Sequence, residues 1–333
     1  MPDPAERHRL GATTVTVTRL GFGAAPIGNL YRAVTDRQAD AAVDAAYTSG
    51  IRFFDTAPLY GHGLSELRLG RALARYPRKA VVVTTKVGRL LVPDAAGSAS
   101  ESLFAEAPAV HPEFDFSYDG AMRSLEASLD RLGLDRVDVL HVHDPDNHAD
   151  VALAGAFRAL RRLRDQGVIG ALGSGMNHPG LLARFVREAG VDCVQLAGRY
   201  TLLDQTAMDE LLPLCQREGV SVIAAGVFNS GILAHPAAGA YYDYAPASPA
   251  VLDRARRLQD VCQSHGATLK AAALQFPLGH PAVATVLTGA QTAAEVEENA
   301  ALFSSPIPAA VWDDMVTTGL LPADTALPVT PAK

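Results

Sequence analysis

Four side chains with complementary acid–base chemistry lie at or just past the ends of candidate strands: Asp55, Tyr60, Lys86 and His143. A free phenol has a pKa near ~10, so a tyrosine moves protons at neutral pH only where its surroundings favour the phenolate. A neighbouring lysine can supply that positive charge, and an aspartate can hold the lysine in an ion pair. The imidazole can hydrogen-bond a substrate oxygen or pass protons. The four residues predict one acid–base site.

The elements that must position these residues follow a repeating pattern. Helical periodicity fills the gaps between apolar segments, for example at Leu125, Leu129 and Leu132. Eight such segments are predicted strands, at residues 20–25, 51–54, 81–85, 137–142, 168–173, 191–196, 220–224 and 283–288. Strands that alternate with helices in this number are typical of an α/β protein of the (β/α)8 TIM barrel class, in which side chains at the carboxyl ends of the strands converge at one mouth.

The barrel is expected to form a single domain over residues 10–325, with flexible tails at 1–9 and 326–333. Residues 13–18 alternate Thr and Val behind a glycine, which predicts an N-terminal β-hairpin. Two segments without helical or strand periodicity, 88–118 and 234–250, are expected as long loops at the carboxyl face of the strands.

Local signals also predict where helices begin. Thr35 with Gln38, and Thr292 with Glu295, have the spacing of a capping box.

Composition narrows the functional classes. The chain has 333 residues, of which 48% are hydrophobic, and a formal net charge of −7, so it can bury a large core and has no basic stretch suited to nucleic acid. No window reaches the ~18 apolar residues of a membrane helix. Cys193, Cys215 and Cys262 are far apart and are expected as inert core thiols. A protein of the reducing cytoplasm, with no membrane partner, is the expectation.

Two other kinds of chemistry fit part of the pattern. His141 and His143 share one strand face, and Asp146 and His148 follow, which is compatible with a metal-dependent barrel hydrolase. That reading leaves Tyr60 and Lys86 without a role, so no metal is expected. A lysine at the end of a barrel strand can also form a Schiff base, as in an aldolase.

Several motifs, in this order and spacing, resemble the aldo-keto reductase superfamily. They are LGFG at 20–23, GIRFFDTA at 50–57, YGHGLSE at 60–66, TKVG at 85–88, HDPD at 143–146, GA at 289–290 and EN at 298–299. The resemblance spans about residues 10–301. It implies the barrel inferred above, a nicotinamide dinucleotide bound without a Rossmann domain, and a catalytic tetrad of Asp55, Tyr60, Lys86 and His143.

Finer motifs resemble the bacterial aldose 1-dehydrogenase group of that superfamily. They are AAPIGNLYR at 24–32, KVGRLLVP at 86–93, FDFS at 114–117, GRYTLLDQ at 198–205 and GVFNSG at 226–231. The group includes L-fucose dehydrogenase and a relative that acts on pyridoxal. The resemblance implies oxidation of an aldose hemiacetal to a lactone by hydride transfer to NAD, with Tyr60 as general acid/base. Oxidation of pyridoxal and general reduction of aldehydes or ketones are the alternatives.

The resemblance also implies a cofactor site, with some departures. Common members have an aromatic residue near Ala225 that stacks on the nicotinamide and a Gln near Ala197 that holds its amide, and this chain has Ala at both. The expected cofactor contacts are Gly23, Asp55, Ser174, Asn177, Gln195, Val227, Phe228, Asn229, Ser230, Gly231, Leu233, Gly289, Ala290, Gln291, Glu295, Glu298 and Asn299. By loop placement, Tyr31, His62, Arg89 and His111 are candidate contacts of a small sugar or aldehyde substrate.

Charge at two of these positions predicts the cofactor. Members that bind NADP have Lys or Arg just after the final strand and in the next helical turn, where this chain has Gln291 and Glu295. A carboxylate repels the 2′-phosphate of NADP, whereas it accepts a hydrogen bond from the ribose hydroxyl of NAD. NAD is therefore favoured over NADP. Free N–H groups at the start of the following helix suit the pyrophosphate.

Overall fold

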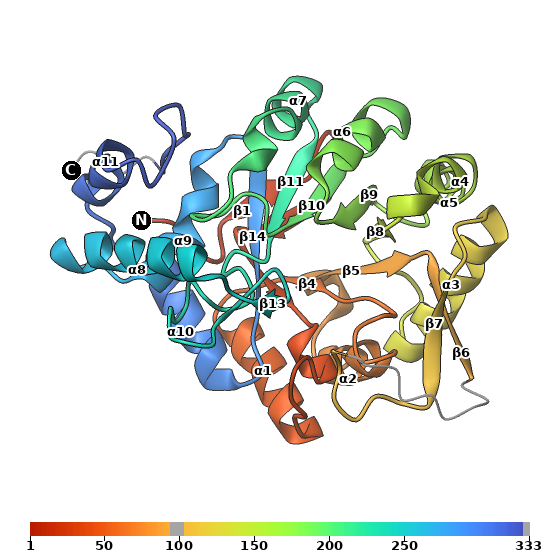
Figure 1. Cartoon of the computed structure of the whole chain (residues 1–333). Coiled ribbons are helices and arrows are strands. Elements are labelled where there is room, and N and C mark those ends of the chain that lie inside the picture. Colours follow the sequence, from red (N-terminus) through yellow and green to blue (C-terminus); the bar gives the residue numbers. More distant parts are fainter. Residues whose placement is uncertain (94–102, 329–333) are drawn as a thin grey trace.

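Eight parallel strands close into a barrel at the centre of the structure, a computed structural model that describes residues 1–93 and 103–328 (Figure 1). Their order around the barrel is β10-β11-β14-β3-β4-β5-β8-β9. The strands are β3 (Leu20–Gly23), β4 (Phe53–Asp55), β5 (Val82–Val87), β8 (Val139–His143), β9 (Ala171–Met176), β10 (Cys193–Ala197), β11 (Ser221–Ala225) and β14 (Val283–Gly289). Each of the eight overlaps a predicted strand, although β9 shares only residues 171–173 with its predicted range, and the predicted TIM barrel is confirmed.

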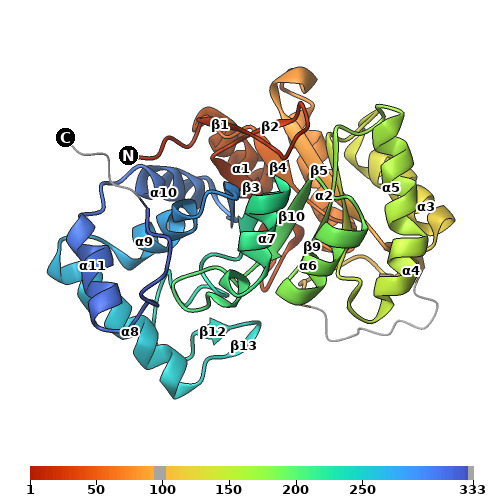
Figure 2. The same ribbon diagram turned by 90° about the horizontal axis from the view of Figure 1, so that it is seen from above.

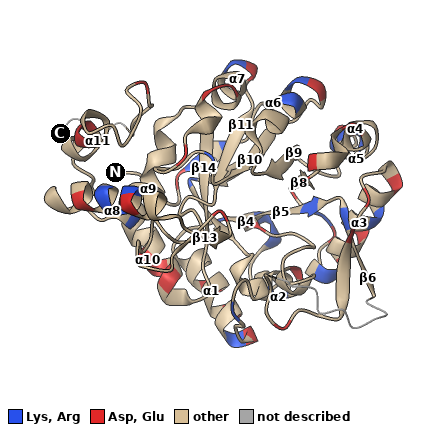
Figure 3. Ribbon diagram, viewed as in Figure 1, with Lys and Arg blue, Asp and Glu red and all other residues tan. Residues whose placement is uncertain are grey.

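Helices lie outside the barrel, as Figures 1 and 2 show. Their bounds are α1 (Asp36–Thr48), α2 (Leu64–Leu73), α3 (Tyr118–Leu132), α4 (Ala149–Ala154), α5 (Ala156–Asp165), α6 (Pro179–Glu188), α7 (Leu211–Glu218), α8 (Pro249–Ser264), α9 (Leu269–Gln275), α10 (Ala293–Phe303) and α11 (Ala309–Thr317). None of the described helices is long and apolar enough to span a bilayer. Figure 3 shows Lys, Arg, Asp and Glu on many of the helices around the barrel.

Side chains alternate between the inside and the outside of the barrel, as the two-residue period of a strand requires. Phe53, Val139, Cys193 and Ile223 belong to the cluster inside the barrel, while their neighbours in sequence pack against the helices. The same alternation sends Asp55, Lys86 and His143 inward at the carboxyl ends of their strands.

The N-terminal hairpin covers the opposite end of the barrel. It pairs β1 (Arg7–Arg9) with β2 (Thr16–Thr18), and Leu10 and Val17 are fully buried in the interior cluster. Figure 2 shows this hairpin at one end of the barrel and the short hairpin of β12 (Tyr241–Tyr242) and β13 (Ala245–Pro246) at the other. The predicted tail at 1–9 is therefore wrong for residues 7–9, which pair through their backbone with residues 16–18.

At the C-terminal end, Ala326 lies against the body of the protein and accepts a hydrogen bond from the Tyr200 hydroxyl (3.5 Å). Residues 329–333 of the predicted second tail lie outside the described residues.

Both predicted long loops contain short antiparallel pairs instead. β6 (Arg89–Pro93) pairs with β7 (Val110–Phe114), and β12 (Tyr241–Tyr242) pairs with β13 (Ala245–Pro246). The side chains of these strands are largely half-buried or exposed, so they lack the apolar alternation that identifies a strand in a sequence.

The two predicted helix starts differ from each other. Thr35 forms the complete capping box with Gln38. Thr292 accepts from the Glu295 backbone N–H, but the Glu295 carboxylate accepts from the N–H of Gln291 at 2.7 Å rather than from that of Thr292. The Glu295 side chain therefore faces the loop after β14.

Candidate active site

The predicted tetrad meets at the mouth of the barrel. The ammonium group of Lys86 lies 2.8 Å and 2.9 Å from the two oxygens of Asp55 and donates to the carbonyl of Thr56 at 2.8 Å. Both side chains of this ion pair are at most 2% exposed. The Lys86 ammonium lies 4.7 Å from the centre of the Tyr60 ring, and the rings of Tyr60 and His143 meet edge to face at 5.8 Å.

The loop that carries Tyr60 is held by a close backbone crossing. A Cβ at Gly28 would lie 3.0 Å from the Tyr60 carbonyl, and a Cβ at Gly61 would lie 2.3 Å from the carbonyl oxygen of Gly28. Gly61 also has a φ of +60°, which glycine adopts without strain. Two glycines therefore let the Tyr60 loop and the loop after β3 pack directly on each other.

Burial keeps the phenol and the imidazole neutral at pH 7. The pKa of His143 is lowered well below its usual value by burial and by the charges of Lys86 and Arg89. The pKa of Tyr60 is raised well above 10, first by burial and then by the carboxylate of Asp55. The predicted effect of Lys86 on the pKa of Tyr60 stays a prediction; in this structure the ammonium is paired with Asp55 and Thr56. Tyr60 thus holds its proton and is set up as an acid.

Two adjoining cavities open at this mouth. The smaller, of about 380 Å³, is lined by Tyr60, Lys86 and His143, together with Arg89, Phe104, Asp144, Asp146, Asn177, Gln195 and Tyr244. The larger, of about 580 Å³, lies between the loop after β11, the loop after β14 and the loop after β3. Leu30 and Tyr244 line both, so the two cavities meet there.

The structure brings most predicted cofactor residues to these cavities. Asn177 and Gln195 line the smaller one, while Val227, Phe228, Asn229, Ser230, Gly231, Gly289, Ala290, Gln291 and Glu295 line the larger one. Gly289 also has a packing reason, because a Cβ there would lie 2.7 Å from the ring of Pro26.

Six predicted cofactor residues line neither cavity: Gly23, Asp55, Ser174, Leu233, Glu298 and Asn299. Ser174 alternates with Gly173 and Gly175, which face the barrel interior, so its hydroxyl points outward and donates to the carbonyl of Val142 at 3.1 Å. Glu298 is paired with Lys270 at 2.6 Å.

The four predicted substrate contacts separate into two pairs. Arg89 lines the smaller cavity and Tyr31 the larger. His62 instead bonds the backbone carbonyl of Val110 at 2.7 Å, and His111 lies on β7 beside Glu113. Neither of these two histidines lines the cavities, because both are held by the β6–β7 hairpin.

Sequence reasoning missed a cation and a carboxylate. Arg32 donates to the side chain of Gln291 and lies 3.3 Å from Glu295, so the larger cavity contains a positive charge that comes from a distant loop. Asp144 lies beside His143 in the smaller cavity and pairs with Arg89. Both residues fall within quoted motifs, Asp144 in HDPD and Arg32 at the end of AAPIGNLYR, but neither motif indicates which partners the side chain contacts.

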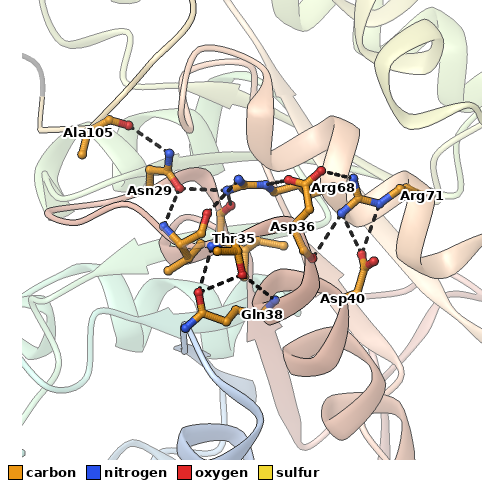
Figure 4. A network of polar contacts seen from close by, with 10 residues as sticks. Asn29, Thr35, Asp36, Gln38, Asp40, Arg68, Arg71 and Ala105 are labelled. Atoms are coloured by element: carbon orange, nitrogen blue, oxygen red, sulfur yellow. Dashed lines mark hydrogen bonds and ion pairs between the residues drawn. The ribbon is translucent and has the colours of Figure 1, made fainter.

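The loop that carries Leu30, Tyr31 and Arg32 to the cavities is anchored by a buried arginine. Arg68 donates to Asp36, to the side chain of Asn29 and to the carbonyls of Ile27 and Val34 (Figure 4). Its side chain is 8% exposed, whereas that of Arg71, which also binds Asp36, is 45% exposed.

Replacing this anchor should loosen the larger cavity. We expect Arg68→Met to lower the free energy of unfolding by about 1–3 kcal/mol, because buried acceptors lose their donor, and to weaken dinucleotide binding. Arg71→Met is the matched control and should change stability by no more than ~0.5 kcal/mol. Thermal unfolding and titration with the reduced cofactor measure both effects; equal behaviour of the two variants would contradict the anchoring role.

A metal centre finds no support in the described residues, where no group of three or more His, Cys, Asp or Glu side chains could hold an ion. His141 is fully buried inside the barrel. A Cβ at Gly173 would lie 2.5 Å from its ring, so that glycine makes space for the imidazole. All three cysteines are buried and unpaired, as predicted.

The mouth of this TIM barrel brings together the Tyr60–His143 pair, the buried Lys86–Asp55 pair and the two adjoining cavities. These features together indicate a barrel oxidoreductase. Residues 19–318 match the model of the aldo/keto reductase family, and the chain belongs to this family. It is 42% identical to pyridoxal 4-dehydrogenase of Microbacterium luteolum, with 95% of this chain and 98% of that protein covered. It is also 42% identical to D-threo-aldose 1-dehydrogenase of a Pseudomonas species, with 93% and 97% covered.

Solved structures agree with this assignment. The holo form of an aldo-keto reductase from Bacillus halodurans superposes with a TM-score of 0.76 at 25% identity, covering 96% of this chain and 98% of that one. The chain is therefore an oxidoreductase that acts on CH–OH groups with a nicotinamide cofactor.

The residues present fit such a cofactor. Within the described part of the chain, the buried oxygens Oε1 of Gln195 and Oδ1 of Asn229 have no hydrogen-bond partner, and they lie in the smaller and the larger cavity respectively. Each can accept from an amide or a hydroxyl of a ligand. The larger cavity also contains the loop that leads into α10, where a helix start favours anions.

Proposed function

We propose that this protein oxidises the hemiacetal carbon of an aldose to a lactone, with NAD as the hydride acceptor. The observation that carries the proposal is the polar wall of the smaller cavity, where Arg89, Asp144 and Asp146 lie beside the Tyr60–His143 pair. A substrate with several hydroxyl groups can satisfy these charged groups, whereas a mostly apolar aldehyde leaves them without partners. The 42% identity to D-threo-aldose 1-dehydrogenase supports the same substrate class.

Tyr60 and His143 handle the proton in this proposal. The bound nicotinamide supplies hydride transfer at the oxidised carbon. In the direction of oxidation Tyr60 acts as the phenolate, whose oxygen takes the proton of the substrate hydroxyl, and neutral His143 holds the substrate oxygen by a hydrogen bond. Asp55 and Lys86 lie behind the phenol and keep the mouth of the barrel dry and charge-balanced.

A panel of substrates tests the proposal directly. L-Fucose, D-arabinose and pyridoxal are each offered with NAD and NADP, and absorbance of the reduced nicotinamide reports turnover. We expect the highest kcat/KM for an aldose with NAD. Turnover of pyridoxal alone would replace the aldose proposal by the activity named for the Microbacterium luteolum relative.

The preference for NAD is part of the proposal and rests on the charges of the larger cavity. Arg32 lies where a 2′-phosphate partner would be needed, but Glu295 and Gln291 already bind it. The positive charge of Arg32 is therefore offset by Glu295, and the 2′-phosphate of NADP would have to displace that carboxylate.

Removing the carboxylate should change the cofactor preference. We expect the double variant Gln291→Arg and Glu295→Arg to raise the ratio of kcat/KM for NADP over NAD at least tenfold, since each contact of a cation with the phosphate contributes about 1.5–3 kcal/mol. Glu295→Gln, which only frees Arg32, should give a smaller shift in the same direction. Glu297→Gln on the same helix is the control, and a wild type that already prefers NADP would refute the charge argument.

A further inference from the structure

An arginine–aspartate pair lies in the smaller cavity beside the catalytic histidine. Nη2 of Arg89 is 2.8 Å from Oδ2 of Asp144, and the same carboxylate oxygen is 3.4 Å from Nε2 of His143. The side chains are 14% and 31% exposed, and both residues line the cavity that contains Tyr60. The pair therefore borders the position of the reacting carbon.

The backbone holds both Arg89 and Asp144 in place, and at Asp144 it is conformationally strained. Asp144 has a φ of +43°, a left-handed conformation that is strained for a residue other than glycine, and its N–H donates to the carbonyl of Gly175 at 3.1 Å. Arg89 follows Gly88, whose φ is +106° and whose missing Cβ leaves space for the ring of Phe116. The guanidinium also stacks on the ring of Phe114 at 4.6 Å.

The pair retains capacity to bind a ligand. Nε of Arg89 is a buried donor without a hydrogen-bond partner in the described part of the chain. A guanidinium offers donors and a carboxylate offers acceptors, so together they match a group that both donates and accepts. Because the two charges compensate each other, the pair suits a neutral ligand better than an anion.

We propose that Arg89 and Asp144 form the specificity element of the site and bind the hydroxyl group on the carbon next to the oxidised carbon. This inference rests on the proposed aldose substrate and deepens it. Tyr60 and His143 hold the oxygen on the oxidised carbon, while Asp144, adjacent to His143, accepts from the neighbouring hydroxyl and Arg89 donates to it. Substrates that lack the neighbouring hydroxyl leave a charged pair without its partner and are rejected.

L-Fucose and 2-deoxy-L-fucose form a matched pair of substrates for the test. In the wild type we expect kcat/KM to be at least tenfold higher for L-fucose. Asp144→Asn and Arg89→Lys should each lower kcat/KM for L-fucose at least tenfold and change that for the deoxy sugar less than threefold. A role of the pair in catalysis or folding alone would lower both values equally, and such a result would overturn the inference.

A second arginine–aspartate pair supplies the control. Asp115 binds Arg123 at 2.7 Å next to the β6–β7 hairpin, which contains Arg89, but Asp115 lines neither cavity. Asp115→Asn should leave the preference for L-fucose unchanged. If the wild type oxidises both sugars equally well, only the role of Arg89 and Asp144 in specificity is contradicted. If the wild type oxidises no aldose, the proposed function is contradicted as well. The wild-type ratio requires no variant and decides the question even where a substitution prevents folding.

Discussion

Tyr60→Phe should lower turnover by ~10² or more and leave dinucleotide binding nearly unchanged. The variant loses only the hydroxyl that gives or takes the proton, while the ring keeps its contacts with His143 and Lys86. Tyr118→Phe, at the start of α3, is the control for loss of a tyrosine hydroxyl elsewhere. Turnover of Tyr60→Phe close to the wild-type rate would assign the proton transfer to another group.

The pH dependence gives an independent test of the same residue. Because the pKa of Tyr60 is raised well above 10, the phenol is protonated throughout the neutral range. Reduction, which needs the acid form, should be constant at neutral pH and fall only in strongly alkaline solution. Oxidation, which needs the phenolate, should become faster as the pH rises. The alkaline fall in the rate of reduction and the alkaline rise in the rate of oxidation should both disappear in Tyr60→Phe. If either change persists, it belongs to the titration of a different residue.

The arrangement of side chains at the mouth of this barrel could be predicted from the sequence because its determinants are local. Asp55, Lys86 and His143 lie at the carboxyl ends of strands with strong apolar patterns, and the two-residue period fixes which side chains face inward. The same period explains why Ser174 does not line the smaller cavity. Its neighbours Gly173 and Gly175 face inward, so the hydroxyl cannot.

The parts that could not be predicted depend on contacts between residues that are distant in the sequence. Arg32 reaches Glu295 and Gln291 from a loop more than 250 residues earlier, so the charge of the larger cavity could not be read from the segment after β14 alone. The β6–β7 hairpin likewise depends on backbone pairing between Arg89–Pro93 and Val110–Phe114, whose side chains carry little pattern. The pKa of Tyr60 depends on burial and on the charge of Asp55, and both follow from packing between distant segments.

Lys86→Met should reduce both turnover and stability. The substitution leaves the carboxylate of Asp55, which is 1% exposed, without its cation, and breaking a buried ion pair by removing one partner costs about 3–5 kcal/mol. It also removes the charge beside the Tyr60 ring. We expect a loss in turnover of ~10² or more, similar to that of Tyr60→Phe.

The pH dependence of stability separates the two effects of this substitution. Burial already raises the pKa of Asp55 above its usual value, and loss of Lys86 raises it further. Below pH ~4, the pKa of an unfolded aspartate, Asp55 is protonated in both the folded and the unfolded variant. Above that pH only the folded variant keeps this proton, so folding must take up a proton. The deficit in stability relative to the wild type should therefore be small in acid and grow toward neutral pH.

A double variant completes the test. Asp55→Asn combined with Lys86→Met removes the buried carboxylate together with its cation, so it should recover most of the lost stability and lose the added pH dependence. Turnover should stay low, because the ammonium beside the phenol is still missing. Thermal unfolding at pH 5 and pH 8, together with kcat for the three proteins, gives all the values needed. Recovery of turnover along with stability would show that Lys86 acts on the reaction only by keeping the barrel mouth folded.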